Sequence, residues 1–180
     1  MADKMESRTG DEMTQYEEAV AEYRWVKENI RYAFSPWGDT ARTLAKQQGH
    51  CGIKAELLVS RLRARGIEAR YVEGRPSLGN LPMMKLAPFS VHFWVEARVD
   101  GRWLTLDATP DSGIVCLSGD TQPGSYLGRP DYITRWHEVP LWYKRLYNHP
   151  LFAPLRWLSN LKLAYYRTVG SKGAKRPTGG

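Results

Sequence analysis

The chain has 180 residues, 42% of them hydrophobic, and a net charge of +7 at neutral pH, which suits one domain with its own core or one domain with an appendage. It has only two cysteines and no CxxC or HxxxH spacing, which excludes a disulfide framework and a metal-ligand cluster, so we expect neither a metal nor another cofactor. The first 13 residues are polar and no segment approaches roughly 18 uninterrupted apolar residues, so we expect a cytoplasmic protein without a targeting or membrane-spanning segment.

The N-terminal part is predicted to form two helices. Residues 1–13 are charged and polar, and we expect them to be disordered. A capping box at Thr14–Glu17, followed by an apolar stripe of helical period, predicts a first helix that extends to about Ala33. The sequence FSPWG at residues 34–38 interrupts it, and a short second helix is predicted over residues 39–48 with its cap at residue 39 or 40.

A third helix is predicted to begin at Cys51. No proline or internal glycine interrupts the chain from Gly52 to Arg65, the apolar residues fall on one helical face, and Gly66 can supply a left-handed stop. A thiol in the first helical turn faces unpaired backbone N–H groups and the positive end of the helix dipole, which favours the nucleophilic thiolate. The alternative for a lone cysteine on an apolar face is a small core residue, so the choice depends on partners elsewhere in the chain.

A strand and a long loop are predicted next. Ile67–Glu73 is the strand candidate. Gly74–Ser90 contains three prolines and two glycines without any period, and it is therefore predicted to be a loop. Its apolar side chains suggest that it covers another part of the molecule, and we assign Met83 and Met84 to a candidate substrate cleft.

A hairpin is predicted after this loop. Val91–Val99 alternates strictly between two faces, and Asp100-Gly101 is a strong two-residue turn sequence. If Val99 pairs with Arg102, the numbers of paired residues sum to 201. One face of the hairpin is then wholly apolar, which supports this register because a slip of one residue would mix the faces.

The register brings a histidine and a carboxylate together. Asp107 lies opposite Trp94 and diagonal to His92, on the same face and within about 7 Å at the backbone. A thiolate nucleophile needs an imidazole to carry its proton, and the imidazole needs an acceptor that fixes its tautomer. Taken singly, His92 could be an ordinary strand residue and Asp107 a strand-end cap. Together with Cys51 at a helix start, they indicate a Cys51–His92–Asp107 catalytic triad.

These residues lie in sequences that resemble the transglutaminase-like superfamily, a branch of the papain-like cysteine fold. The resemblance covers roughly Ile30–Pro110 and rests on GHCG at residues 49–52, HFWVE at 92–96 and WLTLDAT at 103–109. It implies an α+β fold in which a nucleophile helix packs against a small antiparallel sheet. It also implies thioester chemistry on a peptide or protein amide, by hydrolysis, deamidation or transfer to an amine. One departure is His50, where bacterial and archaeal members often carry an acidic residue.

The oxyanion formed during such a reaction needs two hydrogen-bond donors. The backbone N–H of Cys51 is one candidate, and the side chains of Gln47, Gln48 or Trp37 could supply the other. The glutamines could equally be ordinary helix-surface residues. Trp94 is assigned to packing beside the triad and to the candidate cleft. A non-catalytic binding module that keeps the fold without turnover remains the alternative to an enzyme.

The remaining sequence is predicted to extend the domain. We expect a catalytic domain over residues 14–130, an aromatic and basic helical extension over 131–170, and a flexible basic tail over 171–180. Pro110–Pro130 is predicted to be a loop that holds Cys116 as a structural residue.

The positive charge is confined to the C-terminal end. No acidic residue follows Glu138, and the lysines and arginines beyond it contribute +8, whereas the first 138 residues sum to −1. This end is also rich in tryptophan and tyrosine, which indicates a local contact, so no specific nucleic-acid binding is expected. Two interpretations stay open: an extension packed on the domain with a basic solvent-exposed face, or a segment that docks to an anionic membrane surface or an acidic partner.

Overall fold

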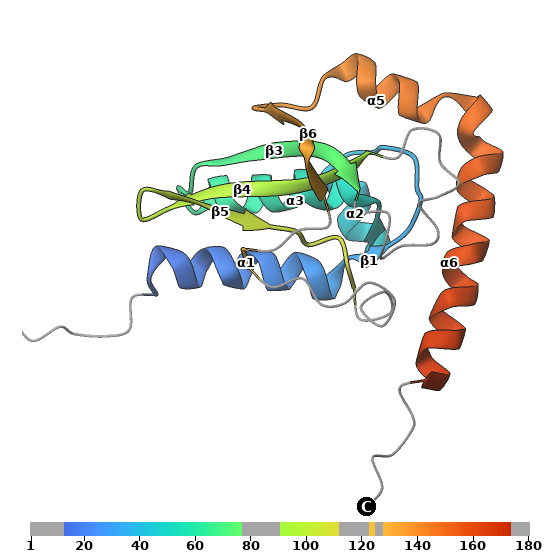
Figure 1. Cartoon of the computed structure of the whole chain (residues 1–180), viewed down its shortest axis with the longest axis horizontal. Coiled ribbons are helices and arrows are strands. Elements are labelled where there is room, and N and C mark those ends of the chain that lie inside the picture. The colour runs from blue at the N-terminus through green and yellow to red at the C-terminus, as the bar shows by residue number, and fades with distance from the viewer. Residues whose placement is uncertain (1–12, 77–90, 112–122, 125–127, 174–180) are drawn as a thin grey trace, which may run out of the picture.

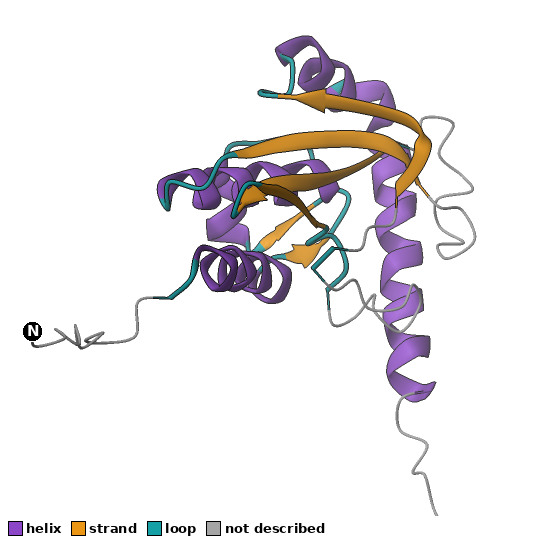
Figure 2. Ribbon diagram, turned by 60° about the vertical axis from the view of Figure 1, so that its left-hand side comes forward, coloured by secondary structure: helices purple, strands orange, loops and turns teal. Residues whose placement is uncertain are grey.

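The computed structural model describes residues 13–76, 91–111, 123–124 and 128–173. Within these residues the chain forms a four-stranded antiparallel sheet with helices packed against it, and a long helix, α6 (Ala153–Gly173), stands along one end of the sheet (Figure 1; Figure 2). The α+β class predicted from the sequence is confirmed. Among the described helices, none contains an apolar stretch long enough to cross a bilayer.

Helix α1 (Gln15–Asn29) begins with the predicted capping box, because Thr14 and Glu17 each accept a hydrogen bond from the other's backbone N–H. It ends four residues before the predicted position. The chain becomes extended at Ile30, and strand β1 (Arg31–Tyr32) pairs in parallel with strand β2 (Gln48–Gly49). This pairing replaces the last predicted turn of the helix.

Helix α2 (Thr40–Lys46) is capped by the side chain of Asp39, as predicted. It ends two residues early because Gln47 adopts a left-handed conformation with φ of 48°. The chain then passes through β2 directly into the next helix.

Helix α3 (Cys51–Ala64) begins at the predicted residue and ends within one residue of the predicted position. Gly66 has φ of +74°, the left-handed conformation expected of a helix stop. Contacts with α1 on one side and with the sheet on the other bury α3 in the centre of the hydrophobic core. Cys51 is thereby placed at the end of a buried helix.

The main sheet has the strand order β5-β4-β3-β6 and is antiparallel throughout. Its strands are β3 (Ala69–Pro76), β4 (His92–Val99), β5 (Arg102–Leu106) and β6 (Gly128–Trp136). The predicted hairpin register is confirmed, since the paired residues of β4 and β5 sum to 201. Its two turn residues, at positions 100 and 101, both have positive φ, as the tightest hairpin turns require.

Two predictions from the sequence are corrected by the sheet. Gly74–Pro76 continues strand β3 and is not part of a loop. Residues 131–136 belong to strand β6, so the helical extension does not begin at Asp131. Both corrections have one cause, because β3 and β6 pair with each other and supply backbone partners that no local pattern reveals. The rest of the predicted loop, including Met83 and Met84, lies outside the described residues.

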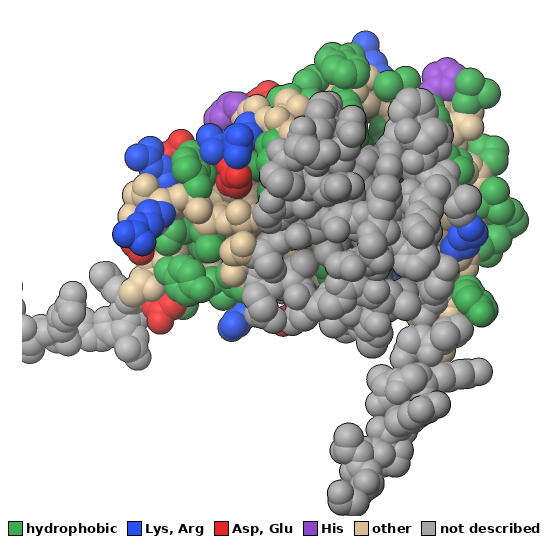
Figure 3. Space-filling model, in the orientation of Figure 1, with side chains coloured by type: hydrophobic (Ala, Val, Ile, Leu, Met, Phe, Trp, Pro, Cys, Tyr) green, Lys and Arg blue, Asp and Glu red, His purple; other side chains and the backbone are tan. Residues whose placement is uncertain are grey.

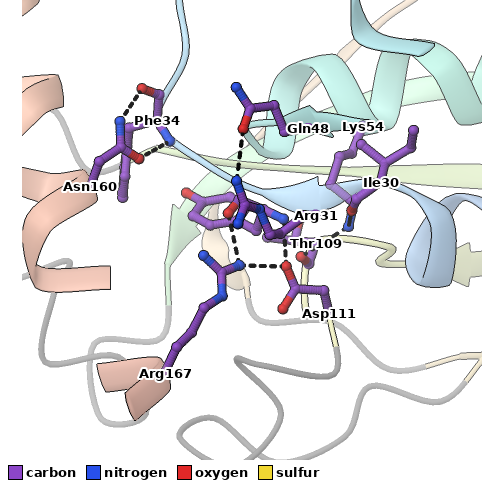
Figure 4. A network of polar contacts seen from close by, with 10 residues as sticks. Ile30, Arg31, Phe34, Gln48, Lys54, Thr109, Asp111, Asn160 and Arg167 are labelled. Atoms are coloured by element: carbon purple, nitrogen blue, oxygen red, sulfur yellow. Dashed lines mark hydrogen bonds and ion pairs between the residues drawn. The ribbon is translucent and has the colours of Figure 1, made fainter. Parts of the chain in front are cut away.

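We use the name C-terminal extension for helix α5 (Leu141–Asn148), the short 3-10 helix (Pro150–Phe152) and α6. Three of its side chains hold the backbone of residues 32–37, from the last residue of β1 onward, and Figure 4 shows two of the three, Asn160 and Arg167. These clamps are Asn148, which bonds to both the N–H and the C=O of Trp37; Asn160, which does the same at Phe34; and Arg167, which donates to the C=O of Tyr32 and pairs with Asp111.

Candidate active site

Cys51 is the first residue of α3, and its surroundings fix the start of that helix. The preceding residue, His50, is the N-cap, and its Nδ1 accepts the N–H of Gly52 at 3.1 Å. The ring of Trp37 lies against Gly52 so closely that an added Cβ would be 2.4 Å from it. The thiol therefore sits where a side-chain cap and an aromatic ring hold the helix end, with 9% of Cys51 exposed.

His92 and Asp107 meet as the hairpin register requires. His92 is the first residue of β4, Asp107 follows β5, and the distance from His92 Nε2 to Asp107 Oδ2 is 2.7 Å. The other carboxylate oxygen, Oδ1, accepts the N–H of Thr109 at 3.0 Å. The exposed fractions of His92 and Asp107 are 2% and 0%, so the pair is shielded from water.

The thiol of Cys51 lies close enough to the same imidazole to help raise the pKa of His92, by hydrogen bonding and by charge. Because Nε2 is bonded to Asp107, Nδ1 is the nitrogen left to exchange a proton with the sulfur. The structure thus brings together the three residues of the predicted triad, in the order thiol, imidazole, carboxylate.

The electrostatics of the pair favour a charged imidazole. Burial alone would lower the pKa of His92, but the charge and hydrogen bond of Asp107, together with Cys51, raise that pKa to about 10. Burial would raise the pKa of Asp107, but His92 and the bonds from Thr109 lower it below its usual value. An imidazolium beside the sulfur stabilises a thiolate, which is the state that attacks a carbonyl.

This pair predicts a pH dependence of stability. The pKa of His92 is about 10 in the folded protein and about 6.5 in the unfolded chain. Protonated His92 therefore stabilises the fold fully below about pH 6.5, and this contribution is lost as pH rises toward about 10. The wild type should therefore have a higher free energy of unfolding than Asp107→Asn near pH 6.5, and this difference should shrink as pH rises toward about 10. Urea unfolding at a series of pH values measures it.

Comparison with the variant is needed because Lys54 titrates in the same window with the opposite sign. Burial lowers the pKa of Lys54 to about 7, so its contribution to stability improves between about pH 7 and 10.5. Lys54 is present in both proteins, and the difference largely removes its effect. A difference that stays constant from about pH 6.5 to about pH 10 would contradict the imidazolium–carboxylate pair.

Trp94 lies beside the triad, with its ring stacked on His92 at a centroid distance of 5.8 Å. It is buried, which agrees with the predicted packing role beside the imidazole, and its assignment to the substrate cleft stays a prediction. Met83 and Met84, the other cleft residues predicted from the sequence, lie outside the described residues, as does Cys116.

The predicted oxyanion donors Trp37, Gln48 and Gln47 are bonded elsewhere or exposed in the structure. The indole N–H of Trp37 donates to Glu56 Oε2 at 2.7 Å, so it is already engaged away from the sulfur. Gln48 accepts a hydrogen bond from Arg31 (Figure 4). Gln47 is exposed at the end of α2. Among the contacts of the described residues, none joins these three side chains to the thiol.

Two tyrosines that the sequence did not single out lie close enough to Cys51 to interact with it electrostatically. Tyr32 comes from β1 and Tyr147 from α5. Burial first, and the neighbouring Cys51 second, raise the pKa of both phenols above the usual value. Both hydroxyls therefore stay protonated donors at neutral pH. Only the aromatic richness of the C-terminal end hinted at Tyr147.

His50 is a second imidazole beside the thiol, but it is not a base. Burial, and then the charge of Arg156, lower its pKa to about 3, so it is neutral at any physiological pH. Because Nδ1 accepts from Gly52, the proton is on Nε2, and this N–H has no partner among the described residues. Its ring packs against Tyr147 at 4.5 Å and Trp37 at 4.8 Å.

A cavity of about 580 Å³ lies away from these residues. It is lined mainly by β1 and the segment after it, by α2 and by α6, with Gln48 of β2 and Ile53 of α3. Its lining includes four cations, Arg31, Arg42, Lys46 and Arg167. None of the three triad residues lines it. The candidate active site is therefore identified by its side-chain geometry and not by an open pocket. No group of residues able to hold a metal ion occurs in the described part of the chain.

Comparison with known proteins gives one family and several distant structures. The family model of the Transglutaminase-like superfamily matches residues 3–108, which include Cys51, His92 and Asp107. No curated protein sequence matches the chain. Three solved structures are similar, each with a TM-score of 0.43.

The first is described as a candidate cysteine protease from Cytophaga hutchinsonii, with 25% identity over 67% of this chain and 40% of its own. The second, a candidate protease from Parabacteroides distasonis, has 20% identity over 56% of this chain and 21% of its own. The third, described as a TGase, has 14% identity over 62% of this chain and 29% of its own. The chain thus spans less than half the length of each.

Proposed function

Because the chain belongs to the transglutaminase-like superfamily, we propose that it is a cysteine-dependent hydrolase or acyltransferase that acts on amide bonds of peptides or proteins. The observation that carries this proposal is the continuous contact from Asp107 through His92 to Cys51 at the start of a buried helix. A purely structural histidine would not need both a buried carboxylate and a thiol as partners.

In the proposed first step, the Cys51 thiolate attacks the carbonyl carbon of the substrate amide. A carbon–sulfur bond forms, and the carbonyl electron pair moves to the oxygen to give an oxyanion. When the oxyanion collapses, the carbon–nitrogen bond breaks, and the leaving amine takes the proton from Nδ1 of the His92 imidazolium. The products of this step are a Cys51 thioester and a free amine or ammonia.

In the second step, water or an acceptor amine attacks the thioester carbonyl. His92 Nδ1 takes a proton from the nucleophile, and the thiolate leaves as the second oxyanion collapses. Water gives a carboxylic acid, and an amine gives a new amide. Asp107 stays ionised throughout and holds the imidazole through Nε2.

The oxyanion donors we propose are the backbone N–H of Cys51 and a tyrosine hydroxyl. At the first helical position the N–H of Cys51 has no acceptor within the helix. Tyr32 and Tyr147 both interact with Cys51, and their raised pKa values keep the phenolic proton in place. Either hydroxyl suits the role better than Trp37, whose N–H is bonded to Glu56.

A second candidate function is a binding module that keeps the fold without turnover. The observation that favours it is the burial of the triad, since Cys51 has only 9% of its surface exposed and His92 has 2%. A closed thiol of this kind would pack in the core and react slowly with any reagent.

Thiol reactivity distinguishes the two functions. At about pH 6, iodoacetamide should label Cys51 faster than Cys116, because Cys51 lies beside the His92–Asp107 pair, which can take up the thiol proton as the sulfur reacts. His92→Ala should remove this preference. Peptide mapping by mass spectrometry quantifies both sites in one sample.

The labelled protein then tests turnover. A screen of peptide substrates for released ammonia or new amino termini, with and without added amine, should give activity that stops when Cys51 is alkylated, because a blocked thiol cannot form the thioester. A Cys51 that reacts in the folded protein only near pH 8.5, or only after denaturation, would eliminate the enzyme and leave the binding module.

A further inference from the structure

Helix α6 faces the body of the protein with polar side chains. Its inward positions are spaced i, i+4, i+7 and i+11, as one helical face requires. They are Arg156, which donates to the C=O of Tyr147; Asn160, which clamps Phe34; Leu163, which is buried; and Arg167, which pairs with Asp111. Arg156 bonds within the extension, and of the three side chains that contact the body, Asn160 and Arg167 are polar or charged.

The opposite side of the extension carries large apolar side chains. Eight of them are between 49% and 80% exposed, and we call them the outer apolar face: Leu141, Trp142, Leu146, Leu151, Trp157, Leu158, Leu161 and Tyr165. Figure 3 shows hydrophobic side chains gathered along the edge of the molecule over α5 and α6. The rest of the described chain contributes only four large apolar residues of comparable exposure.

This distribution is the reverse of that in a water-exposed amphipathic helix. Such a helix buries its apolar stripe and leaves its polar side in solvent. Here polar clamps hold the extension to the body, and the apolar stripe points outward. An exposed apolar surface of this extent, arranged on two consecutive helices, is typical of a surface that another apolar phase covers.

The charges beside the outer apolar face define what could cover it. Arg145 and Lys162 are exposed on the same two helices. No carboxylate side chain occurs anywhere after Glu138, so the face has cationic neighbours and no anionic ones. Tryptophan, tyrosine and leucine combined with lysine and arginine are the composition of helices that lie in the membrane–water interface.

We propose that the outer apolar face docks on the surface of a bilayer that contains anionic lipid. The extension lies in the headgroup region with its Trp and Leu side chains among the upper acyl chains, while Arg145 and Lys162 contact lipid phosphates. It does not span the bilayer, in agreement with the absence of a sufficiently apolar helix among the described residues. The inward clamps leave the rest of the protein standing above the surface.

Flotation with lipid vesicles tests the proposal, using phosphatidylcholine alone and a 70:30 mixture with phosphatidylglycerol at low salt. Full-length protein should float with the mixed vesicles. The double variant Trp157→Gln/Leu161→Gln should reduce the partition coefficient at least tenfold, because two interfacial apolar side chains are lost. Arg145→Gln/Lys162→Gln should reduce binding to the mixed vesicles by roughly fivefold per charge removed.

The matched control is Leu44→Gln, which changes an apolar residue of similar exposure on α2, outside the extension. It should float like the wild type. Circular dichroism melts should be unchanged for every variant, because all the substituted side chains point to solvent. Alkylated Cys51 should not alter flotation, so the result is independent of the proposed enzymatic function.

Two outcomes would overturn the proposal. One is an absence of flotation with mixed vesicles at low salt. The other is a dimer, measured by light scattering, that Trp157→Gln/Leu161→Gln converts to a monomer, because a second copy would then cover the outer apolar face. Flotation that declines with added salt but persists in part supports the proposal, since salt screens the charges and leaves the apolar contribution.

Discussion

Asp107→Asn is expected to lower turnover by about four orders of magnitude while the protein stays folded. Asp107 Oδ1 accepts the N–H of Thr109, so an asparagine that keeps this bond presents its NH2 group to His92 Nε2. Nε2 must then act as an acceptor, and the proton moves to Nδ1. That nitrogen faces the sulfur and can no longer accept its proton.

The change is measured as kcat/KM on any substrate found by the peptide screen. The matched control is Glu96→Gln, a carboxylate-to-amide change on the same strand as His92. Glu96 pairs with Arg70 and Arg135, away from the thiol, so near wild-type turnover is expected. Equal activity of wild type and Asp107→Asn would remove Asp107 from the proposed mechanism.

Gly52→Ala is expected to destabilise the protein by about 1–3 kcal/mol, the usual cost of forcing extra volume into a packed site. The new Cβ would lie 2.4 Å from the ring of Trp37. That ring cannot swing away freely, because its N–H bonds to Glu56 and its faces and edges contact His50, Phe93, Tyr143 and Tyr147. The start of α3 must move instead, and Cys51 moves with it.

Urea unfolding gives the stability, and the iodoacetamide rate at pH 6 reports the position of the thiol. Gly38→Ala is the matched control, since its Cβ would meet Arg42 at 3.4 Å, an ordinary contact with a flexible side chain. It should change neither quantity appreciably. Gly52→Ala with wild-type stability would mean that the Trp37 ring is held loosely.

The parts of the fold that the sequence predicted well are those encoded locally. The hairpin register follows from the turn dipeptide Asp100-Gly101 and from the alternation of apolar and polar residues along the two strands. Both signals are contained in 18 consecutive residues. The start of α3 follows from an uninterrupted apolar face and a glycine stop. Because the register determines which side chains share a face, the contact of His92 with Asp107 could be predicted before the structure was known.

The parts that were missed depend on partners far away in the chain. Tyr147 reaches Cys51 from α5, nearly a hundred residues later, and no local period indicates this approach. The indole of Trp37 was a candidate oxyanion donor, and only the position of Glu56 on α3 shows that its N–H is bonded elsewhere. Strand β6 was misread because its evident neighbours in sequence are helical, while its pairing partner β3 lies more than fifty residues earlier.

The clamps on residues 32–37 have a consequence for biosynthesis. The side chains that bond to Trp37, Phe34 and Tyr32 follow them by 111, 126 and 135 residues. At roughly 5–20 residues per second, the last clamp leaves the ribosome roughly 7–27 s after the segment that it holds. Until then the backbone groups that the clamps hold, the N–H and C=O of Trp37 and Phe34 and the C=O of Tyr32, lack these side-chain partners. The segment beside the nucleophile helix therefore gains these three side-chain partners only after α5 and α6 have been synthesised.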